Sequence, residues 1–282
     1  MNYITLSRTR LHRKGANRTS KTARRKEKLD RKPPNALLLS FIFQKMACNK
    51  CENTLAADAR KIMDAAWTSI TNELGENTLV FPREIFWLNG APGAGKGTQT
   101  NFIMECRGLK AGPVVISDLL QSPEAKKLKD AGLMVGDSEV IGLMLRALLD
   151  PKLASGVIVD GFPRTAVQAE CLKILFANLK ALHARDAKRY PDPIFRIVML
   201  LVGEKTSVER QLSRGVKAKA AGEILRKTDT DPAAALGRYT TFLEVTHKPL
   251  KNLQGVFPYH LIDAEKSIEE VQVLIKRELG KV

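Results

Sequence analysis

The feature that most constrains this chain is a glycine-rich turn between an apolar run and a predicted helix. The run covers residues 84–89, and Gly-Ala-Pro-Gly-Ala-Gly-Lys-Gly-Thr follows directly at residues 90–98. Glycines let backbone N–H groups converge on phosphate oxygens, while Lys96 and the N-terminus of a helix beginning near it attract negative charge. The spacing fits the P-loop pattern, except that Gly97 takes the usual Ser/Thr position and Thr98 follows. The sequence therefore predicts a nucleoside triphosphate site at this turn.

Most of the positive charge lies in the first 45 residues. The chain has 282 residues and a formal net charge of +16, of which +11 falls in residues 1–45 and +5 in the remainder. Residues 7–32 hold almost no large apolar side chains, so we predict disorder there. The apolar run at 36–43 is too short to span a bilayer, and we expect no membrane span. The mildly positive remainder suits phosphorylated ligands and predicts no specific nucleic-acid partner.

The basic segment admits four interpretations. It resembles an organellar transit peptide, and its basic stretch before a short apolar run also resembles a secretory signal. It fits upstream sequence ahead of a working start at Met46, or an arm that contacts nucleic-acid phosphates without specificity. We favour a dispensable or targeting segment.

Cysteine usage indicates a reducing compartment. The chain has four cysteines, too few and too scattered for a disulfide framework. The cytoplasm is therefore the expected location, with organellar targeting as the alternative. Cys48 and Cys51 have the spacing of half a zinc site or a redox pair. No second Cys/His pair stands nearby and no strand–helix context surrounds them, so we expect no function for this pair.

The sequence divides into an extension at 1–45, an N-terminal helical segment at 46–80 and a domain at 81–282. In the helical segment, apolar spacing predicts a helix over 53–76 that Asn53 caps. In the domain, apolar runs alternate with helical patterns, which predicts an α/β fold with a parallel sheet covered on both faces. Ser267 and Glu270 have the spacing of a capping box. The predicted strands are 84–89, 114–117, 156–160, 195–202 and 259–262, and the predicted helices lie near 98–106, 122–131, 138–149, 165–183, 206–214, 232–252 and 267–279.

Charged residues follow the ends of these strands, where parallel sheets bind ligands. Asp160 ends one strand and is suited to orienting Mg²⁺ through its waters. Arg164 is suited to clamping a phosphate, and Gln168 to reading a base edge. Four further arginines, with few acids to neutralise them, suit the charge of a transferring phosphoryl group. They are Arg210, Arg214, Arg226 and Arg238.

At these motifs the chain resembles the adenylate kinase family of nucleoside monophosphate kinases. Residues 90–99 match that family's P-loop, and Asp-Gly-Phe-Pro-Arg-Thr at 160–165 resembles its most specific signature. The resemblance covers about residues 84–280 and implies a three-layer P-loop fold with a five-stranded parallel core, an acceptor flap and a lid. It also implies an enzyme that moves the γ-phosphoryl group of ATP·Mg²⁺ to a nucleoside monophosphate, most often AMP.

The resemblance further implies roles for individual residues. ATP would lie on the P-loop and near Arg210, against Gly90, Gly93, Ala94, Gly95, Lys96, Gly97 and Thr98. The monophosphate would contact Ser117, Val135, Gly161, Arg164 and Gln168. The transferring group would be neutralised by the catalytic residues Lys96, Arg164, Arg214, Arg226 and Arg238, with Asp160 among them. Mg²⁺ would be held through water by Asp160 and, as a weaker candidate, Asp118.

Two segments depart from the family's pattern. Gln121 stands where the family has an arginine for the acceptor phosphate, and the flap before Val135 is several residues shorter. The lid between Arg214 and Arg226 is short and has no cysteine, so no zinc is expected. Its small, basic residues 216–222 indicate a flexible cover. Two alternatives therefore stay open: a P-loop kinase of another small acceptor, and a nucleotide-binding protein without transfer. We expect a monomer whose partners are small-molecule nucleotides.

Overall fold

The computed structural model describes residues 34–130, 135–222 and 225–280, with side chains from Asn53 onward except at 129 and 130. The basic segment at 7–32 and the side chains of Cys48 and Cys51 lie outside the described residues, and the predictions about them stay predictions. The chain divides into two units, residues 1–50 and residues 51–282. The second unit contains all of the described strands.

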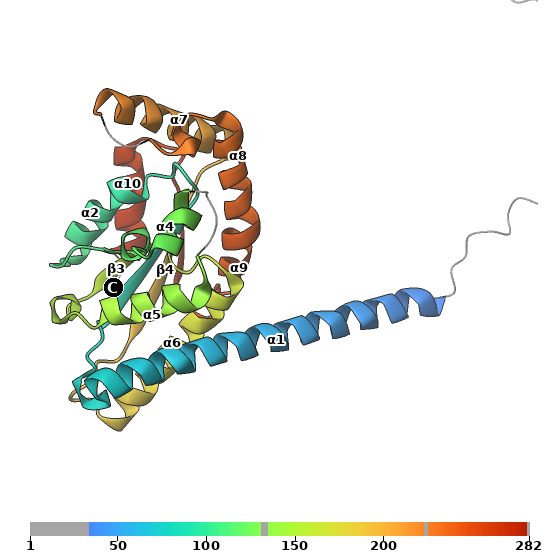
Figure 1. Cartoon of the computed structure of the whole chain (residues 1–282), viewed down its shortest axis with the longest axis vertical. Helices are drawn as coiled ribbons and strands as arrows, with labels where there is room; N and C mark the ends of the chain where they lie inside the picture. Colours follow the sequence, from blue (N-terminus) through green and yellow to red (C-terminus); the bar gives the residue numbers. More distant parts are fainter. Residues whose placement is uncertain (1–33, 131–134, 223–224, 281–282) are drawn as a thin grey trace, which may run out of the picture. The chain divides into compact units, whose positions relative to one another are not determined.

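Five parallel strands form the sheet at the centre of the second unit, in the order β2-β3-β1-β4-β5 (Figure 1). Parallel pairing places Phe86 beside Ile158 on one side and Arg196 on the other, so the strand that feeds the glycine-rich turn is central. The α/β fold with a parallel sheet is confirmed. The strands are β1 (Glu84–Gly90), β2 (Val114–Val115), β3 (Val157–Asp160), β4 (Ile194–Leu201) and β5 (Tyr259–Asp263).

Helices cover both faces of this sheet. On the face that carries Phe86, α2 (Lys96–Arg107) packs with α10 (Ile268–Leu279), and the Arg107 guanidinium lies 5.6 Å from the Phe86 ring. Side chains alternate along a strand, so Trp87 faces the other way. There it meets Phe195 at 5.2 Å, and Phe176 of α6 (Ala166–Arg185) packs on Phe195.

The remaining elements connect or flank these strands and helices. In chain order they are η1 (Glu76–Thr78), α3 (Ile116–Leu119), α4 (Pro123–Asp130), α5 (Asp137–Leu148), η2 (Pro151–Leu153), α7 (Glu204–Ala220), η3 (Lys227–Asp229), α8 (Pro232–Thr241), the π-helical turn η4 (Phe242–His247) and α9 (Lys248–Lys251). The capping box at the start of α10 is confirmed, because Ser267 and Glu270 each bond the other's backbone N–H.

The second half of α1 (Pro34–Leu74) belongs to the hydrophobic core. Ala59 and Met63 are fully buried, and the Cys171 thiol of α6 donates to the Ala59 carbonyl at 3.4 Å. The prediction that Asn53 caps a helix is wrong, because the helix already begins at Pro34. Across the part of the chain that the structure describes, no helix combines the length and apolar character needed to cross a membrane.

Two predicted segments differ from the structure. Residues 114–117 were expected to form one strand, but only Val114 and Val115 pair with β3, and a short helix begins at Ile116. Residues 216–222 were expected to form a flexible cover, but α7 continues to Ala220. Lysine and alanine are strong helix formers, and they extend the helix once it has begun.

A buried ion network joins the amino-terminal end of the sheet to α2. Glu84 accepts hydrogen bonds from Arg107 Nη2 at 2.9 Å and from Arg196 Nε at 2.5 Å. The three side chains are only 12–14% exposed. One carboxylate therefore neutralises two guanidinium groups where water has little access.

Replacing Glu84 with alanine should destabilise the protein by about 3 kcal/mol, because two buried cations lose their counter-charge. Urea unfolding measures the change. The control is Glu73→Ala, which removes a pair with Arg146 whose side chains are 52% and 43% exposed and should cost less than about 1 kcal/mol. Equal, small effects of the two replacements would contradict the importance of this network.

Candidate active site

The turn after β1 has a backbone that requires glycine. Gly93 and Gly95 adopt positive φ angles of 74° and 82°, a region that other residues seldom occupy. At Gly90, a Cβ atom would lie 2.6 Å from the Leu200 carbonyl oxygen. Helix α2 then begins at Lys96, and the N–H groups of its first turn have no partner within the helix. The turn therefore presents backbone donors and a helix N-terminus at the carboxyl end of the sheet.

Lys96 lies across the mouth of this turn. Its Nζ donates to the Gly90 carbonyl at 3.0 Å. The pKa of Lys96 is lowered to about 8, mainly by burial; Asp160 acts in the opposite direction, and the neighbouring charges of Arg164, Arg238 and Arg214 contribute to the lowering. A lysine held in this way gains most when an anion enters, because the anion supplies the charge that the protein lacks there.

A second loop, residues 161–165, places Arg164 beside this lysine. Its Nε donates to the Gly161 carbonyl at 2.7 Å, and a Cβ atom at Gly161 would lie 2.5 Å from Arg164 Nη2. Burial lowers the pKa of Arg164 and raises that of Asp160. Their charges act against these shifts, because Asp160 raises the pKa of Arg164 and Arg164 lowers that of Asp160. Asn89 Nδ2, from β1, donates to the Pro163 carbonyl at 3.1 Å and ties the two loops together.

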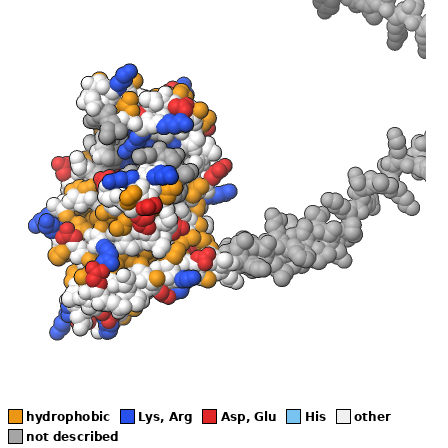
Figure 2. All heavy atoms as spheres, in the orientation of Figure 1, with side chains coloured by type: hydrophobic (Ala, Val, Ile, Leu, Met, Phe, Trp, Pro, Cys, Tyr) orange, Lys and Arg blue, Asp and Glu red, His pale blue; other side chains and the backbone are white. Residues whose placement is uncertain are grey.

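Three arginines lie on a third side of this site: Arg214 of α7, Arg226 directly before η3, and Arg238 of α8. Arg214 Nη2 and Nε donate to the buried carboxylate of Asp229, whose other oxygen accepts from the Arg226 backbone N–H at 3.2 Å. Burial lowers the pKa of Arg238 to about 10, and the positive charges of Arg226, Arg214 and Arg164 contribute. Figure 2 shows Lys and Arg side chains gathered in the upper part of the molecule, below α7.

Comparison with known proteins identifies the fold that carries these loops. Residues 89–223 match the sequence model of a family described as "AAA domain". The chain is 34% identical over 195 residues to an adenylate kinase of Xanthobacter autotrophicus, covering 63% of this chain and 93% of that protein. It is 32% identical over 197 residues to an adenylate kinase of Brucella anthropi, covering 67% of this chain and 95% of that protein. The chain belongs to the adenylate kinase family.

A third relative agrees with this assignment. An adenylate kinase of Azorhizobium caulinodans is 36% identical over 154 residues, which cover 51% of this chain and 72% of that protein. The chain is therefore a P-loop phosphotransferase enzyme of the nucleoside monophosphate kinase class. Its five-stranded parallel sheet is the one that membership of the adenylate kinase family implied.

Arg210 occupies a structural position in this adenylate kinase fold. Its guanidinium donates to the Ala264 carbonyl at 2.7 Å and to the Glu265 carbonyl at 3.2 Å. It also reaches the Gly93 carbonyl at 3.4 Å. Arg210 therefore links α7 to the glycine-rich turn and to the segment that follows β5.

On the acceptor side, Ser117 and Gln121 make local hydrogen bonds. Ser117 Oγ donates to the exposed Asp118 carboxylate at 3.1 Å, and Gln121 Nε2 donates to the Asp118 carbonyl at 2.6 Å. Val135 is buried and lies two residues before the start of α5. Residues 131–134 of the flap lie outside the described residues.

The amide of Gln168 has partners at both ends. Gln168 is 2% exposed, its Oε1 accepts from Arg164 N at 2.7 Å, and its Nε2 donates to Asp137 Oδ1 at 2.8 Å. Sequence reasoning placed Gln168 at a base edge and overlooked Asp137. No local pattern links residues 31 positions apart. The acidic residue at the start of the helix after the flap is the sequence feature that could have marked Asp137 as a candidate.

The donor set fits Mg²⁺ that arrives with a nucleotide. Within the described ranges, no three or more His, Cys, Asp or Glu residues gather as a metal cage. Asp118 is close enough to Asp160 for its charge to raise the Asp160 pKa. Mg²⁺ retains several waters and binds one or two carboxylates together with substrate phosphates, so two neighbouring carboxylates near Lys96 and Arg164 suit it.

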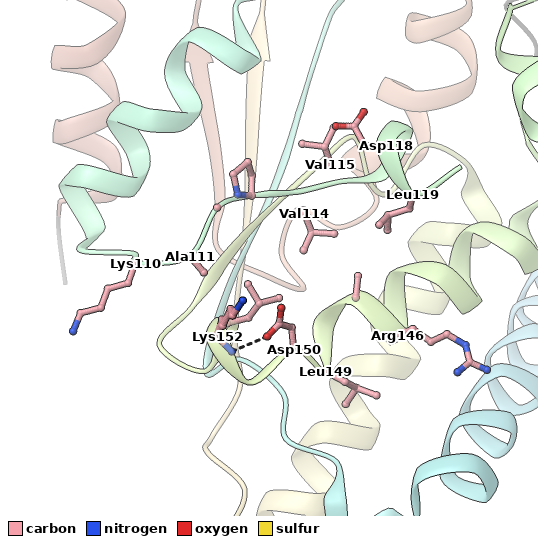
Figure 3. A pocket seen from close by; sticks show the side chains of 14 residues that line it. Lys110, Ala111, Val114, Val115, Asp118, Leu119, Arg146, Leu149, Asp150 and Lys152 are labelled. Atoms are coloured by element: carbon pink, nitrogen blue, oxygen red, sulfur yellow. Dashed lines mark hydrogen bonds between the residues drawn. The ribbon is translucent and has the colours of Figure 1, made fainter. Parts of the chain in front are cut away.

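A separate cavity of about 1090 Å³ lies along the edge strand β2 (Figure 3). Val114 and Leu119 line one side, and Leu149, Asp150 and Lys152 line the other. Neither Lys96 nor Arg164 borders this space, although Asp118 does. The cavity is therefore distinct from the cluster of cations formed by Lys96, Arg164, Arg214 and Arg238.

Proposed function

We propose that this protein moves the γ-phosphoryl group of ATP·Mg²⁺ to a nucleoside monophosphate, with AMP as the first acceptor to test. The observation that carries the proposal is a convergence of cations from separate elements. Arg164, Arg214 and Arg238 each lower the pKa of Lys96, although they lie 68 or more residues away in sequence. Like charges held together in partial burial are unfavourable unless a polyanion joins them. The adenylate kinase relatives support the same class of substrate.

The glycine-rich turn and Lys96 form the donor side of this proposal. Backbone N–H groups and the α2 N-terminus bind the β- and γ-phosphates, and the Lys96 ammonium adds a point charge. Arg210 holds the turn in place through its contact with Gly93. Asp160 and Asp118 would hold Mg²⁺ through its waters, and the ion would supply charge neutralisation for the phosphates.

Arg164 forms the acceptor side. Its Nε is occupied by the Gly161 carbonyl, which fixes the orientation of the guanidinium group. A planar guanidinium binds phosphate oxygens in pairs and fixes their direction. The acceptor phosphate on Arg164 is thereby brought towards the γ-phosphate on Lys96.

Arg214, Arg226 and Arg238 act on the group in transfer. In phosphoryl transfer the protein's work is alignment and charge stabilisation, because little covalent chemistry is required of it. Movement of α7 and η3 over the nucleotides would bring these arginines onto the equatorial oxygens and exclude water, which otherwise hydrolyses ATP.

The test is direct measurement of diphosphate formation by the full chain from ATP·Mg²⁺ and each of AMP, UMP, CMP, GMP and dTMP. Turnover with AMP supports the proposal. Turnover with another monophosphate keeps the reaction and changes the acceptor, an outcome that Gln121 in place of the family's arginine favours. ATP binding without any acceptor activity would leave a binding protein or a kinase of another small molecule.

Replacing Arg164 with alanine should raise the KM for the acceptor roughly 100-fold, because a paired, charge-assisted contact is lost. The KM for ATP should stay within about twofold, since the donor side keeps its own groups. Steady-state kinetics with each substrate varied separate the two effects. Arg277→Ala is the control, since Arg277 lies on α10 and its side chain is 64% exposed. Equal losses for both substrates would contradict the acceptor role of Arg164.

We assign this activity to residues 81–282, with residues 46–80 as an added helical segment and residues 1–45 outside the chemistry. We also propose a monomer in the cytoplasm, with organellar targeting by the basic segment as the alternative. Size-exclusion chromatography with light scattering tests the first point, and microscopy of a tagged full chain tests the second.

A further inference from the structure

One hydrogen-bond network ties the end of the acceptor flap to the Arg164 loop. Asp137 is the first residue of α5, directly after the flap, and its Oδ1 accepts from Gln168 Nε2 at 2.8 Å and from Thr165 Oγ1 at 2.9 Å. Thr165 is the N-cap of α6 and accepts from Gln168 N at 3.1 Å. Gln168 Oε1 in turn accepts from Arg164 N at 2.7 Å.

The carboxylate of Asp137 determines which way the Gln168 amide points. An ionised carboxylate only accepts hydrogen bonds, so the group that faces it must be the donating NH₂ of the amide. The carbonyl end of Gln168 is then directed at the Arg164 N–H. Because Gln168 is 2% exposed, water cannot replace either partner if one is removed.

Fixing the Arg164 backbone also fixes its guanidinium. The Arg164 side chain folds back onto the Gly161 carbonyl three residues earlier, at 2.7 Å. The loop between these residues has little room, since a Cβ atom on Gly161 would lie 2.5 Å from Arg164 Nη2. A shift of the Arg164 N–H therefore moves the group that the proposed function places on the acceptor phosphate.

We propose that Asp137 is a positioning residue for Arg164 and that it acts through the Gln168 amide. This inference rests on the proposed function, in which Arg164 binds the acceptor phosphate. Asp137 itself touches neither nucleotide. It connects helix α5, which follows the flap, to the loop that holds Arg164. The helix and the loop therefore keep a fixed position relative to each other.

Gln168 and Thr165 both donate to the same oxygen of Asp137, so one replacement can keep this acceptor and another can remove it. Asp137→Asn keeps an Oδ1 acceptor, whereas Asp137→Ala removes it. Each variant loses the negative charge at the α5 N-terminus, so the charge effect cancels when the two are compared. Where Asp137→Ala does not fold, Asp137→Leu fills the same space without an acceptor.

Asp137→Ala should raise the acceptor KM about tenfold, which corresponds to about 1.4 kcal/mol, with the ATP KM and kcat within about twofold. Asp137→Asn should stay close to the unmodified protein. In an Arg164→Ala background, Asp137→Ala should add no further rise, because its effect passes through Arg164. Additive losses, equal effects on both substrates, or an Asp137→Asn variant as impaired as Asp137→Ala would each overturn the proposal.

Hydrogen exchange at the Arg164 amide provides a readout that needs no activity. NMR of the full chain should show this amide exchanging at least about tenfold faster in Asp137→Ala than in Asp137→Asn, because the Gln168 acceptor is misdirected. Equal exchange rates would overturn the positioning role. If the unmodified protein phosphorylates no monophosphate, the proposed function fails, and the exchange rates still decide the role of Asp137.

Discussion

Methionine in place of Lys96 should lower kcat by roughly 10³-fold or more, because the donor loses a charge that is preorganised for the transferring group. The side chain keeps nearly its length, so the glycine-rich turn keeps its shape. The hydrogen bond from Lys96 Nζ to the Gly90 carbonyl is lost with the ammonium group. Direct assay of diphosphate formation measures the loss.

The same replacement should not destabilise the protein. Burial is the main cause that lowers the pKa of Lys96 from 10.5 to about 8. Below pH 8 the charged lysine therefore reduces the free energy of unfolding. Between pH 8 and 10.5 the unfolded chain still holds the proton that the folded chain has released, so the stability of the unmodified protein rises with pH. The methionine variant should lack this rise, which urea unfolding at a series of pH values tests.

Lys205→Met is the matched control for the lysine experiment. Lys205 lies at the start of α7, and its side chain is 89% exposed. It should change neither kcat nor the pH dependence of stability. A Lys96→Met variant that retains turnover would remove Lys96 from the proposed phosphate site, whatever its effect on stability.

Alanine at Gly215 should lower kcat roughly 100-fold, because the new methyl group displaces the lid. A Cβ atom at this position would lie 1.9 Å from the Asp229 carbonyl oxygen and 2.9 Å from Asp229 Cβ. Helix α7 and η3 must then separate, and the pairing of Arg214 with Asp229 is broken. A displacement of about 1 Å in a group that contacts the transferring phosphoryl is sufficient for a loss of this size.

Gly237→Ala provides the control for this lid experiment. Gly237 also lies within a helix, α8, but a Cβ atom there would meet nothing within 4 Å. Alanine should therefore stabilise the protein by about 0.5–1 kcal/mol through helix propensity, with kcat unchanged. Thermal unfolding and the kinetic assay together distinguish the two glycines. An unchanged kcat in Gly215→Ala would show that the contact between α7 and η3 does not govern transfer.

Local patterns predicted the parts of the fold that local chemistry determines. The strand at 84–89, the helix start near Lys96 and the capping box at Ser267 depend on residues close in sequence, and the structure confirms each. The sheet order was not predicted beyond its parallel direction, because pairing between Phe86 and Arg196 spans more than a hundred residues. The early end of β2 at Val115 also escaped prediction, since Ile116 and Ser117 have no clear preference against a strand.

The candidate site shows the same division. Sequence spacing identified Lys96, Arg164 and the lid arginines as candidates, and the structure brings them to one end of the sheet. Their contacts with nucleotides stay predictions. The close approach of Gly215 to Asp229 and the bond between Asp137 and Gln168 join distant segments, and no periodicity or motif spacing reports such contacts. Residue type predicted a base-reading role for Gln168, which stays a prediction; in the structure both ends of its amide have protein partners.

Burial, together with the charges of neighbouring arginines, lowers the pKa of Arg238 to about 10, and this crowding of positive charge has a practical consequence for handling the protein. The repulsion is relieved by any small polyanion that enters the cluster, including the phosphate, sulfate or citrate of an ordinary buffer. Dilute Tris and concentrated phosphate would thus report different melting temperatures for the same sample. Thermal stability is in this respect a joint property of the polypeptide and its solvent, and we expect buffer anions to compete with nucleotides for the proposed site.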